Sequence, residues 1–372
     1  MENWNKISFT ELISDRTKDG IKLPTNEYNQ SGLTAIIDQG QEFIAGYSDE
    51  TEGAFTDVPA IIFGDHTRVF KYVDFPFFLG ADGVKVLKAN QEINYKYLYY
   101  YFLQAKFPNT GYARHFKWLK ELQIPLPPLE TQKYIAAVLD KCSALIAKHK
   151  QMLEKYDTLI KSRFIEMFGD PVENPKQWNI EKLKSLTSKI GSGATPKGGR
   201  ESYISEGISL VRSMNVYKGF FEYEGLAHIT EAQAKELDNV TLQENDVLLN
   251  ITGASVARCC ILPKDVLPAR VNQHVSILRT TEKINPVYLS NLLISDTEQR
   301  VLLGIGGAGG ATREAITKTE LESLDIPVPP LELQQQFATF VQQIDKSKFA
   351  VQKSLEKAET LYKSLMQEYF GE

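Results

Sequence analysis

Two glycine-rich stretches are the parts of this chain that come closest to a phosphate-binding loop. They are GSGATPKGG, at residues 191–199, and GIGGAGGATR, at residues 304–313. A nucleotide-binding loop of the form GxxxxGK[ST] needs a lysine followed by a hydroxyl residue, because these two hold the phosphates and the metal ion. Neither stretch supplies that pair. We interpret both as surface loops that bind no nucleotide, although glycine lets main-chain amides come close to a phosphate backbone.

Other catalytic and metal-binding patterns are missing from the sequence as well. The three cysteines, Cys142, Cys259 and Cys260, form neither a CxxC zinc pattern nor a disulfide framework. We find no HExxH, no paired-carboxylate site and no convincing Ser/His/Asp set. Methyltransferases that act on exocyclic amines carry Asn or Asp, two prolines and an aromatic residue, whereas the prolines at 127–128 have leucines on both sides. The chain is therefore predicted to be non-catalytic, with no metal ion and no cofactor of its own.

The composition is that of a two-domain globular protein. The chain has 372 residues, of which 42% are hydrophobic and 24% charged. No apolar run reaches the roughly 18 residues that span a bilayer, and the N-terminus does not read as a signal peptide, so we expect a cytoplasmic protein. The net charge of −5 weighs against nucleic acid. Any surface for a polyanion must therefore be a local patch.

A segment of the chain occurs twice. Residues 119–170 align with residues 321–372 without a gap, and 20 of the 52 positions are identical. The most similar part is a proline cluster, IPLPPLE at 124–130 and IPVPPLE at 326–332, and both copies end in Phe-Gly-acid. A gapless match of this length indicates an internal duplication.

The repeat continues from the second copy to the start of the chain. After the first Phe-Gly-acid the chain reads WNIEKLKSLTS, from Trp178, and its beginning reads WNKISFTELIS, from Trp4. The unit is therefore Trp-Asn, a variable body, IPxPPLE, a long helix and Phe-Gly-acid. The two bodies show little likeness apart from INYKYL, at 93–98, and INPVYL, at 284–289.

Each proline cluster is predicted to be extended and to lead into a long helix, since proline fixes φ and keeps its predecessor out of the α region. The following residues contain no Gly or Pro and carry a stripe at alternating spacings of three and four, which predicts a heptad seam. Each helix would be about 57 Å long. We predict that the two pack antiparallel within one chain; two separate hairpins or a homodimeric coiled coil are the alternatives. The seam positions are Cys142, Ile146, His149, Leu153, Tyr156, Ile160, Arg163 and Met167, then Phe337, Val341, Ile344, Lys348, Val351, Leu355, Ala358, Tyr362, Leu365 and Tyr369.

These features resemble the specificity subunit of type I restriction-modification enzymes. The resemblance covers essentially the whole chain, as two variable bodies that each precede IPxPPLE and a long repeated helix. Both bodies also contain phrases similar to those of the family's recognition domains. In the second body these are SGATPKGG (192–199), ISLVRSMNV (208–216), DVLLNITGASVARCCI (246–261) and VNQHVSILR (271–279). In the first they are PAIIFGDHTRVFKYVDFPF (59–77) and LGADGVKVLK (79–88).

The resemblance implies a mixed α/β (α+β) fold with a pseudo-twofold internal repeat. Two globular target-recognition domains are joined by two long antiparallel helices that form an intramolecular coiled coil. The implied divisions are target-recognition domain 1 at 1–123, a PPLE linker and central long helix at 124–170, target-recognition domain 2 at 171–325, and a PPLE linker and C-terminal long helix at 326–372.

The implied function is that of a non-catalytic DNA-specificity subunit. Each domain reads one half of a bipartite target, while the helices set the spacer and dock the methylation subunits. The implied partners are double-stranded DNA, two methylation subunits that hold S-adenosylmethionine and methylate adenine, and restriction subunits that use ATP and Mg²⁺; no membrane is implied. A helix of about 57 Å corresponds to roughly 17 base pairs, so changing its length should change the unread gap but not the half-sites.

Candidate DNA-reading residues follow from the chemistry of base edges. Arg, Lys, Asn, Gln, Ser and Thr carry the matching donors and acceptors, and they must lie on loops or strand ends. In the second body three clusters beside strand-like runs meet this condition, and Lys197 in the glycine loop suits a phosphate. The clusters are Arg212, Ser213 and Asn215; Thr252, Ser255 and Arg258; and Asn272, Gln273 and His274.

In the first body the candidates lie in two of the recognition-domain phrases. An aspartate there can accept from a cytosine amine or hold a neighbouring arginine. Any one of these side chains also suits a solvated surface or a turn cap, so the clusters are stronger predictions than their members. They are Asp65, His66, Thr67, Arg68 and Lys71, with Asp82 and Lys85.

Two other functions remain open from the sequence. A coiled-coil scaffold with two adaptor domains and no DNA binding suits the acidic charge, but the recognition-domain phrases count against it. A self-contained restriction or methylation enzyme needs catalytic motifs that we do not find.

Overall fold

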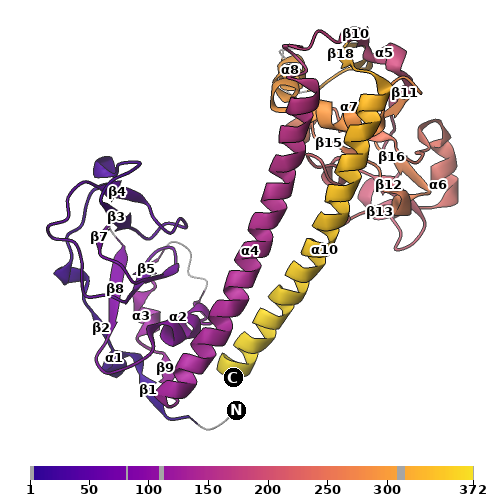
Figure 1. The fold of residues 1–372 in the computed structure, drawn as a ribbon. Coiled ribbons are helices and arrows are strands. Elements are labelled where there is room, and N and C mark those ends of the chain that lie inside the picture. The colour runs from indigo at the N-terminus through magenta and orange to yellow at the C-terminus, as the bar shows by residue number, and fades with distance from the viewer. Residues whose placement is uncertain (1–3, 81–82, 109–112, 308–314, 372) are drawn as a thin grey trace. The chain divides into compact units, whose positions relative to one another are not determined.

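Two compact units make up the chain in the computed structural model, which describes residues 4–80, 83–108, 113–307 and 315–371. The units are Met1–Gln151 with Gln352–Glu372, and Met152–Val351. Each contains one globular body and parts of both long helices, α4 (Leu129–Phe168) and α10 (Leu331–Phe370). Figure 1 labels the helices and strands of each unit.

The body of the first unit is built on two sheets and a short ladder. The four-stranded antiparallel sheet has the order β2 (Ile13–Asp15), β8 (Val84–Ala89), β5 (Ala60–Gly64), β6 (Phe70–Val73). The three-stranded sheet has the order β4 (Gly46–Ser48), β3 (Thr34–Ile37), β7 (Phe77–Leu79), and the ladder joins β1 (Lys6–Ser8) to β9 (Gln123–Pro125). Its short helices are α1 (Phe9–Leu12), α2 (Tyr95–Leu103) and α3 (Phe116–Leu119), with 3₁₀ turns η1 (Thr17–Asp19) and η2 (Thr25–Glu27).

The body of the second unit repeats this plan. Its four-stranded sheet has the order β11 (Thr187–Ser192), β17 (Val275–Thr280), β14 (Val247–Asn250), β15 (Cys259–Ile261). Its three-stranded sheet has the order β13 (Ala227–Ile229), β12 (Ile208–Val211), β16 (Ala269–Val271), and β10 (Asn179–Lys182) pairs with β18 (Asp325–Val328). The helices are α5 (Leu183–Leu186), α6 (Glu231–Glu236), α7 (Pro286–Leu293), α8 (Asp296–Gly307) and α9 (Lys318–Glu322). The 3₁₀ turns are η3 (Gly199–Ser202), η4 (Ser213–Asn215), η5 (Asp238–Val240), η6 (Gly253–Ser255) and η7 (Lys264–Val266).

The two bodies have the same topology, strand for strand. In chain order the strands from β2 to β8 pair as those from β11 to β17 do. Even the mixed sheet is reproduced, since β3 pairs antiparallel with β4 and parallel with β7, and β12 does the same with β13 and β16. The duplication therefore includes the bodies, although their sequences showed little likeness.

The two long helices run antiparallel, as predicted. In the first unit Ile135 and Leu139, near the start of α4, share an apolar cluster with Met366, near the end of α10. In the second unit the end of α4 packs on the start of α10, where Phe164 and Phe337 have ring centroids 5.6 Å apart. Every predicted seam position is buried or half-buried, so the predicted heptad register is confirmed as well.

A buried glutamine holds each proline cluster against its body. In the first unit the Gln132 side chain accepts a hydrogen bond from the Asn94 amide at 2.9 Å and donates to the Pro127 carbonyl at 2.8 Å. In the second unit Gln334 makes the same two bonds, with the Asn285 amide and the Pro329 carbonyl, both at 2.8 Å. We call these bonds the glutamine latch. Both glutamines are almost completely buried, at 2% and 0% exposure.

A tyrosine completes each junction. The Tyr97 hydroxyl donates to the Pro125 carbonyl at 2.9 Å, and the Tyr288 hydroxyl donates to the Pro327 carbonyl at 2.8 Å. Tyr97 also packs on Phe370 at the end of α10, with centroids 5.4 Å apart. The C-terminal helix therefore returns to the first body, which explains why the sequence repeat closes on itself.

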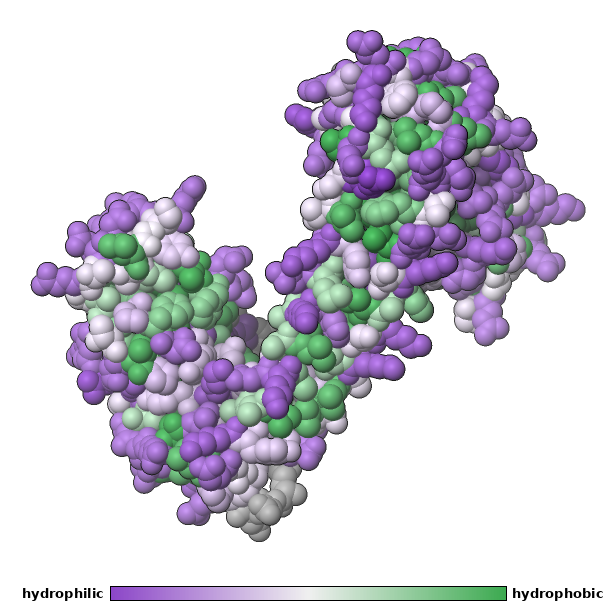
Figure 2. All heavy atoms as spheres, in the orientation of Figure 1, coloured by the Kyte–Doolittle hydropathy of each residue, from purple (hydrophilic) through white to green (hydrophobic). Residues whose placement is uncertain are grey.

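Polar residues cover most of the visible face of each body, with apolar residues scattered among them (Figure 2). Several larger apolar side chains lie exposed on the long helices, including Leu145, Phe349 and Leu361, at 45%, 73% and 52% exposure. None of the helices in the described residues is long and apolar enough to cross a membrane.

Replacing Gln334 with Leu should destabilise the second unit by about 2–4 kcal/mol. The Asn285 N–H and the Pro329 carbonyl lose their buried partner, and each unsatisfied group costs about 1–3 kcal/mol. Urea denaturation followed by tryptophan fluorescence measures the change. Gln336→Leu, on the exposed side of the same helix, is the matched control. Equal stability of the two variants would show that the latch contributes nothing.

Glu298 should make the protein less stable as the pH rises. Burial, and then the charges of Asp170 and Asp325, raise the pKa of this 4% exposed carboxyl to about 7. The folded state then holds the proton more tightly than the unfolded state. Stability therefore falls between about pH 4.5 and 7, by about 3 kcal/mol for a shift of this size.

Glu298→Gln should remove that pH dependence and raise the unfolding temperature at pH 8. Calorimetry from pH 4.5 to 8 measures it, with Glu236→Gln, an exposed residue of α6, as control. A variant whose unfolding temperature changes with pH as the wild type's does would contradict this account of Glu298.

Candidate nucleic-acid interface

The loops at one end of the second body's four-stranded sheet gather the predicted residues. The register pairs Ser192 of β11 with Ser276 of β17, and Asn250 of β14 with Val275 of β17. The end of β11, the start of β17 and the end of β14 therefore lie at the same end of the sheet. The Asn272 main chain ties in two more segments, since its N–H donates to the Val211 carbonyl and its carbonyl accepts from the Gly193 N–H.

Two adjoining pockets open among these loops. The Arg258 pocket, of about 520 Å³, is lined by Ser213, Thr252, Gly253, Ala254, Ser255, Arg258, His274 and Ala315. The Arg212 pocket, of about 440 Å³, is lined by Thr195, Gly199, Tyr203, Arg212, Ser213, Met214, Asn272 and His274. Ser213 and His274 belong to both. The structure thus brings together three clusters that are up to 62 residues apart in the sequence.

Arg258 is held in place without using its hydrogen-bond donors. Its guanidinium lies 4.6 Å from the centre of the Tyr217 ring, which stacks on Phe220 with centroids 5.0 Å apart. No hydrogen bond or ion pair joins the guanidinium to another described residue. Two other arginines of this body differ, because Arg270 binds Asp238 at 2.7 Å and Arg279 binds Asp246 at 2.8 Å. Arg258 therefore presents a positioned fork of donors to the pocket, the arrangement that suits a guanine edge or a phosphate.

A chain of polar side chains links the glycine loop to the end of β14. The Thr195 hydroxyl donates to Gln273 Oε1 at 2.5 Å, and Gln273 Nε2 donates to His274 Nε2 at 3.1 Å. His274 Nδ1 then lies 2.5 Å from the Thr252 hydroxyl. Because an amide N–H can only donate, the neutral ring carries its proton on Nδ1. The exposed Gln273 and half-buried His274 are thus pre-positioned at the surface.

Two of the predicted asparagines support the loops from inside. Asn215 is fully buried; its oxygen accepts from the Arg212 N–H at 3.1 Å and its nitrogen donates to the Glu222 carbonyl at 2.9 Å. Asn272 is 6% exposed and accepts from the His274 N–H at 3.0 Å. Asn215 is therefore not placed to touch a ligand, and both residues act on the backbone that carries the neighbouring side chains.

The remaining predicted residues of the second body lie at the surface of the loops. The Arg212 guanidinium lies 5.3 Å from the centre of the Tyr203 ring and donates to the Gly225 carbonyl, so part of its donor capacity is used within the protein. Ser213 and Ser255 are half-buried in the pocket walls. Lys197 is exposed in the glycine loop but lines neither pocket.

In the first body the predicted residues lie around the β5–β6 turn. Thr67 and Arg68 are exposed at its tip, where Arg68 adopts a left-handed φ of 65°. Asp65 is 5% exposed and accepts from the Phe116 N–H at 2.7 Å, so it anchors the turn from inside. The Thr67 hydroxyl donates to the Gln39 carbonyl at 2.6 Å. By topology this turn is the counterpart of the β14–β15 segment that carries Arg258.

The other predicted residues of the first body differ in accessibility. The His66 N–H donates to Gln39 Oε1 at 3.3 Å, and the residue is half-buried. Lys71 is only 4% exposed and donates to the Glu42 carbonyl; burial lowers its pKa, partly offset by Asp38. It is not placed to reach a ligand. Lys85 pairs with Asp15 at 2.8 Å. Asp82 lies outside the described residues.

Sequence reasoning missed three contributors. The Tyr217 ring lies beneath the Arg258 guanidinium, and the Tyr203 ring lies beneath that of Arg212. An isolated tyrosine in a sequence gives no sign of such a contact. Gln39 contacts the β5–β6 turn from the β3–β4 segment, which is the topological counterpart of the loop after β12 that carries Arg212. Only the shared topology reveals that equivalence.

The two adjacent cysteines of the second body are buried. Burial raises the pKa of Cys259 well above its usual range and that of Cys260 to about 12, so both thiols stay protonated. Among the residues that the structure describes, no group of three or more His, Cys, Asp or Glu side chains is placed to hold a metal ion.

The family comparison places this chain in a class of DNA-specificity proteins. The family model for the type I restriction modification DNA specificity domain matches residues 1–155 and 175–359. The chain belongs to this family, and its role is DNA sequence specificity with two recognition domains.

Individual relatives match over most of their length. The chain is 23% identical over 339 residues to the type I restriction enzyme EcoR124I/EcoR124II specificity subunit of Escherichia coli, covering 86% of this chain and 81% of that protein. It is 26% identical over 318 residues to the MjaVIII specificity subunit of Methanocaldococcus jannaschii, covering 78% and 74%.

A solved structure supports the fold. The type I restriction-modification S subunit from M. genitalium superposes with a TM-score of 0.67, covering 98% of this chain and 95% of that one at 16% sequence identity. This likeness concerns the fold alone.

Proposed function

We propose that this chain is the non-catalytic reading subunit of a type I restriction-modification complex, and that each body reads one half of a bipartite DNA target. The observation that carries the proposal is the convergence of three polar clusters around Arg258, whose donors are unused by the described residues. A positioned guanidinium with free donors can bond two atoms of a guanine edge at once. The equivalent β5–β6 turn of the first body, with Thr67 and Arg68, would read the other half.

The long helices would set the gap between the half-sites. Each contains 40 residues and is about 60 Å long at 1.5 Å per residue, which corresponds to roughly 18 base pairs. Their exposed apolar side chains, such as Leu145 and Phe349, are typical of a surface that binds another protein. We propose two methylation subunits as those partners.

The chemistry would belong to the partner subunits. Methylation subunits would supply S-adenosylmethionine and transfer a methyl group to adenine, and restriction subunits would use ATP and Mg²⁺ to cleave. This chain would contribute recognition of double-stranded DNA in the cytoplasm and no cofactor of its own.

Adenine methylation in cells tests the proposal directly. We expect that a methylation-free host that expresses this chain with its methylation subunits acquires N6-methyladenine at one split motif with a fixed gap, read by long-read sequencing. The methylation subunits alone are the control. A methylated genome whose pattern does not depend on this chain would contradict the proposal and favour a scaffold role.

Arg258→Ala should reduce discrimination between the motif and a scrambled duplex by about 10- to 100-fold, because one bidentate base contact is worth about 1–3 kcal/mol. Competition binding with the complex that contains the methylation subunits measures this ratio. Arg300→Ala, an exposed arginine of α8, is the charge-matched control. Equal losses on both duplexes would make Arg258 a phosphate contact instead.

Tyr217 variants separate the positioning of Arg258 from its charge. Tyr217→Phe keeps the ring under the guanidinium and should keep the discrimination, whereas Tyr217→Leu should lose most of it. Loss in both variants would assign the effect to the Tyr217 hydroxyl.

A further inference from the structure

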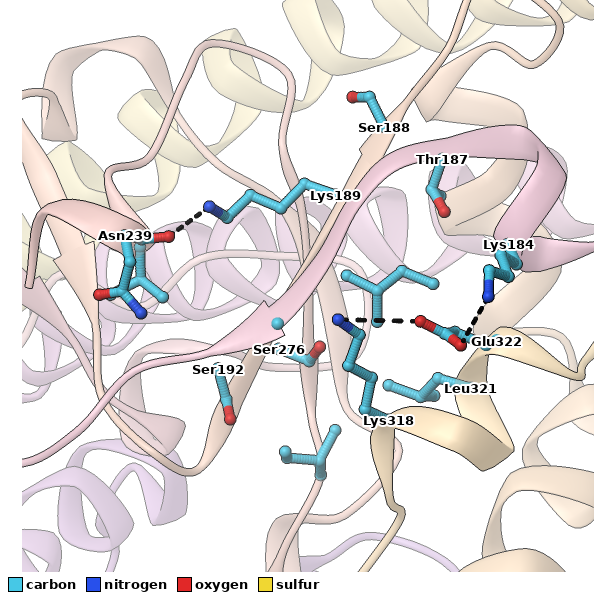
Figure 3. A pocket seen from close by; sticks show the side chains of 14 residues that line it. Lys184, Thr187, Ser188, Lys189, Ser192, Asn239, Ser276, Lys318, Leu321 and Glu322 are labelled. Carbon is cyan, nitrogen blue, oxygen red and sulfur yellow. Dashed lines mark hydrogen bonds and ion pairs between the residues drawn. The ribbon is translucent and has the colours of Figure 1, made fainter.

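The edge of the second body's four-stranded sheet borders a polar groove. Strand β11 is the outermost strand, and on its free side no other strand of the described residues pairs with it. A groove of about 670 Å³ follows this edge, between β11 and α9 (Figure 3). We call it the β11 groove and define it by Lys184, Lys189, Ser192, Ser276, Lys318 and Glu322.

Three lysines from three different elements line the groove. Lys184 comes from α5, Lys189 from β11 and Lys318 from α9 (Figure 3). Lys184 and Lys318 share one carboxylate, that of Glu322, at 3.4 and 3.8 Å, while 72% and 63% of their side chains stay exposed. Lys189 donates to the Asn239 main-chain carbonyl, which is uncharged. Three ammonium groups with one counter-charge make this a positive patch on an acidic chain.

Two hydroxyls lie deeper in the groove. Ser192 and Ser276 are directly opposite each other across β11 and β17, and Ser276 is 1% exposed. Neither hydroxyl bonds another described residue. The half-buried Ser192 hydroxyl can donate to a phosphate oxygen, whereas Ser276 is too deeply buried to reach one.

The groove adjoins the candidate DNA interface along the chain, because neighbouring residues line the two. Ile251 lines the groove and Thr252, the next residue, lines the Arg258 pocket. Ser276, near the start of β17, lies two residues after His274 at the end of the sheet that carries these loops. Lys189 is three residues before Ser192 along β11, which is about 10 Å at 3.3 Å per residue. That distance corresponds to about three base pairs along a duplex axis, at 3.4 Å each.

We propose that the β11 groove binds the DNA backbone beside the half-site read by the second body. The inference rests on the proposed function and extends it to a site that reads no bases. Lys184, Lys189 and Lys318 contact phosphates that flank the recognised base pairs, and they bind equally well whatever the flanking sequence is. The charge of the groove and its position next to the loops favour DNA over an added peptide strand.

Salt-dependent binding of the full complex tests the groove. The variant is Lys184→Gln with Lys318→Gln, and the matched control is Lys235→Gln with Lys264→Gln, two exposed lysines of the same body outside the groove. For each protein the affinity is measured by fluorescence anisotropy between about 50 and 300 mM salt, on motif and scrambled duplexes. The slope of log affinity against log salt should become shallower by about 0.9 for each lost phosphate contact.

We expect the groove variant to lose about 1.8 from this slope and the control to lose none. The affinities for motif and scrambled duplexes should fall by the same factor, because phosphate contacts carry no sequence information. Shortening the duplex at the end beside this half-site should weaken the wild type and leave the groove variant unchanged. Unchanged circular dichroism melting would establish that both variants are folded.

Three results would overturn the inference. They are a groove variant with the slope of the control, a loss confined to the motif duplex, and a loss of assembly with the methylation subunits at unchanged DNA affinity. The last would assign the groove to a protein segment instead.

The proposed function has a separate test, which is whether the wild-type complex binds the motif duplex more tightly than the scrambled duplex. A complex without this preference would contradict the proposed function. The groove is judged by the salt slope, which is measured on scrambled DNA as well.

Discussion

The glutamine latch is the interaction on which the architecture depends. A cluster of three prolines in five residues leaves the chain with carbonyls that no neighbouring proline N–H can satisfy, at the point where a helix must leave a globular body. Gln132 and Gln334 fill that need from the first turn of each helix, bonding a proline carbonyl with one end of the amide and the cap of a body helix with the other. One side chain thereby fixes the direction of the long helix relative to its own body. The same solution appears twice because the whole unit was duplicated.

The arginines of the second body have two kinds of environment: some form ion pairs with other described residues of the body, and Arg258 does not. Arg270 forms an ion pair with Asp238, and Arg279 forms one with Asp246. These two arginines therefore hold loops to the sheet. Arg258 is supported by an aromatic ring instead, which positions the guanidinium and leaves its donors available. A chain of net charge −5 can therefore still present an arginine that has no carboxylate partner among the described residues. The net charge is a sum over the whole chain, whereas attraction of a ligand depends on the few charged side chains near it that have no partner of opposite charge.

The shared topology of the two bodies shows where sequence identity is needed and where it is not. Strands such as β5 and β14 are buried along their whole length, and many apolar sequences satisfy that condition. The segments that follow these strands differ, because they contact different side chains in each body. The turn after β5 contacts Gln39, and the segment after β14 places Arg258 over Tyr217. The frame keeps its residues in both copies, because the Gln amide donates and accepts there, the Tyr hydroxyl donates to a main-chain carbonyl, and proline keeps the segment extended.

The sequence alone determined the duplication, from a gapless match, and also the extended proline clusters and the heptad seam, which follow from local backbone chemistry and from a period that persists over many residues. It favoured an antiparallel helix pair within one chain but left two alternatives open, and the contacts of the tertiary structure decided between them. It also located the polar clusters around residues 212, 252–258 and 272–274, since polar runs beside apolar strands mark strand ends. Only the tertiary structure decided which members of those clusters face outward. Asn215, Asp65 and Lys71 have the right chemistry for a ligand, yet they are buried and bonded within the protein. Exposure, and the ring beneath Arg258, depend on contacts between strands far apart in the chain, which no local pattern records.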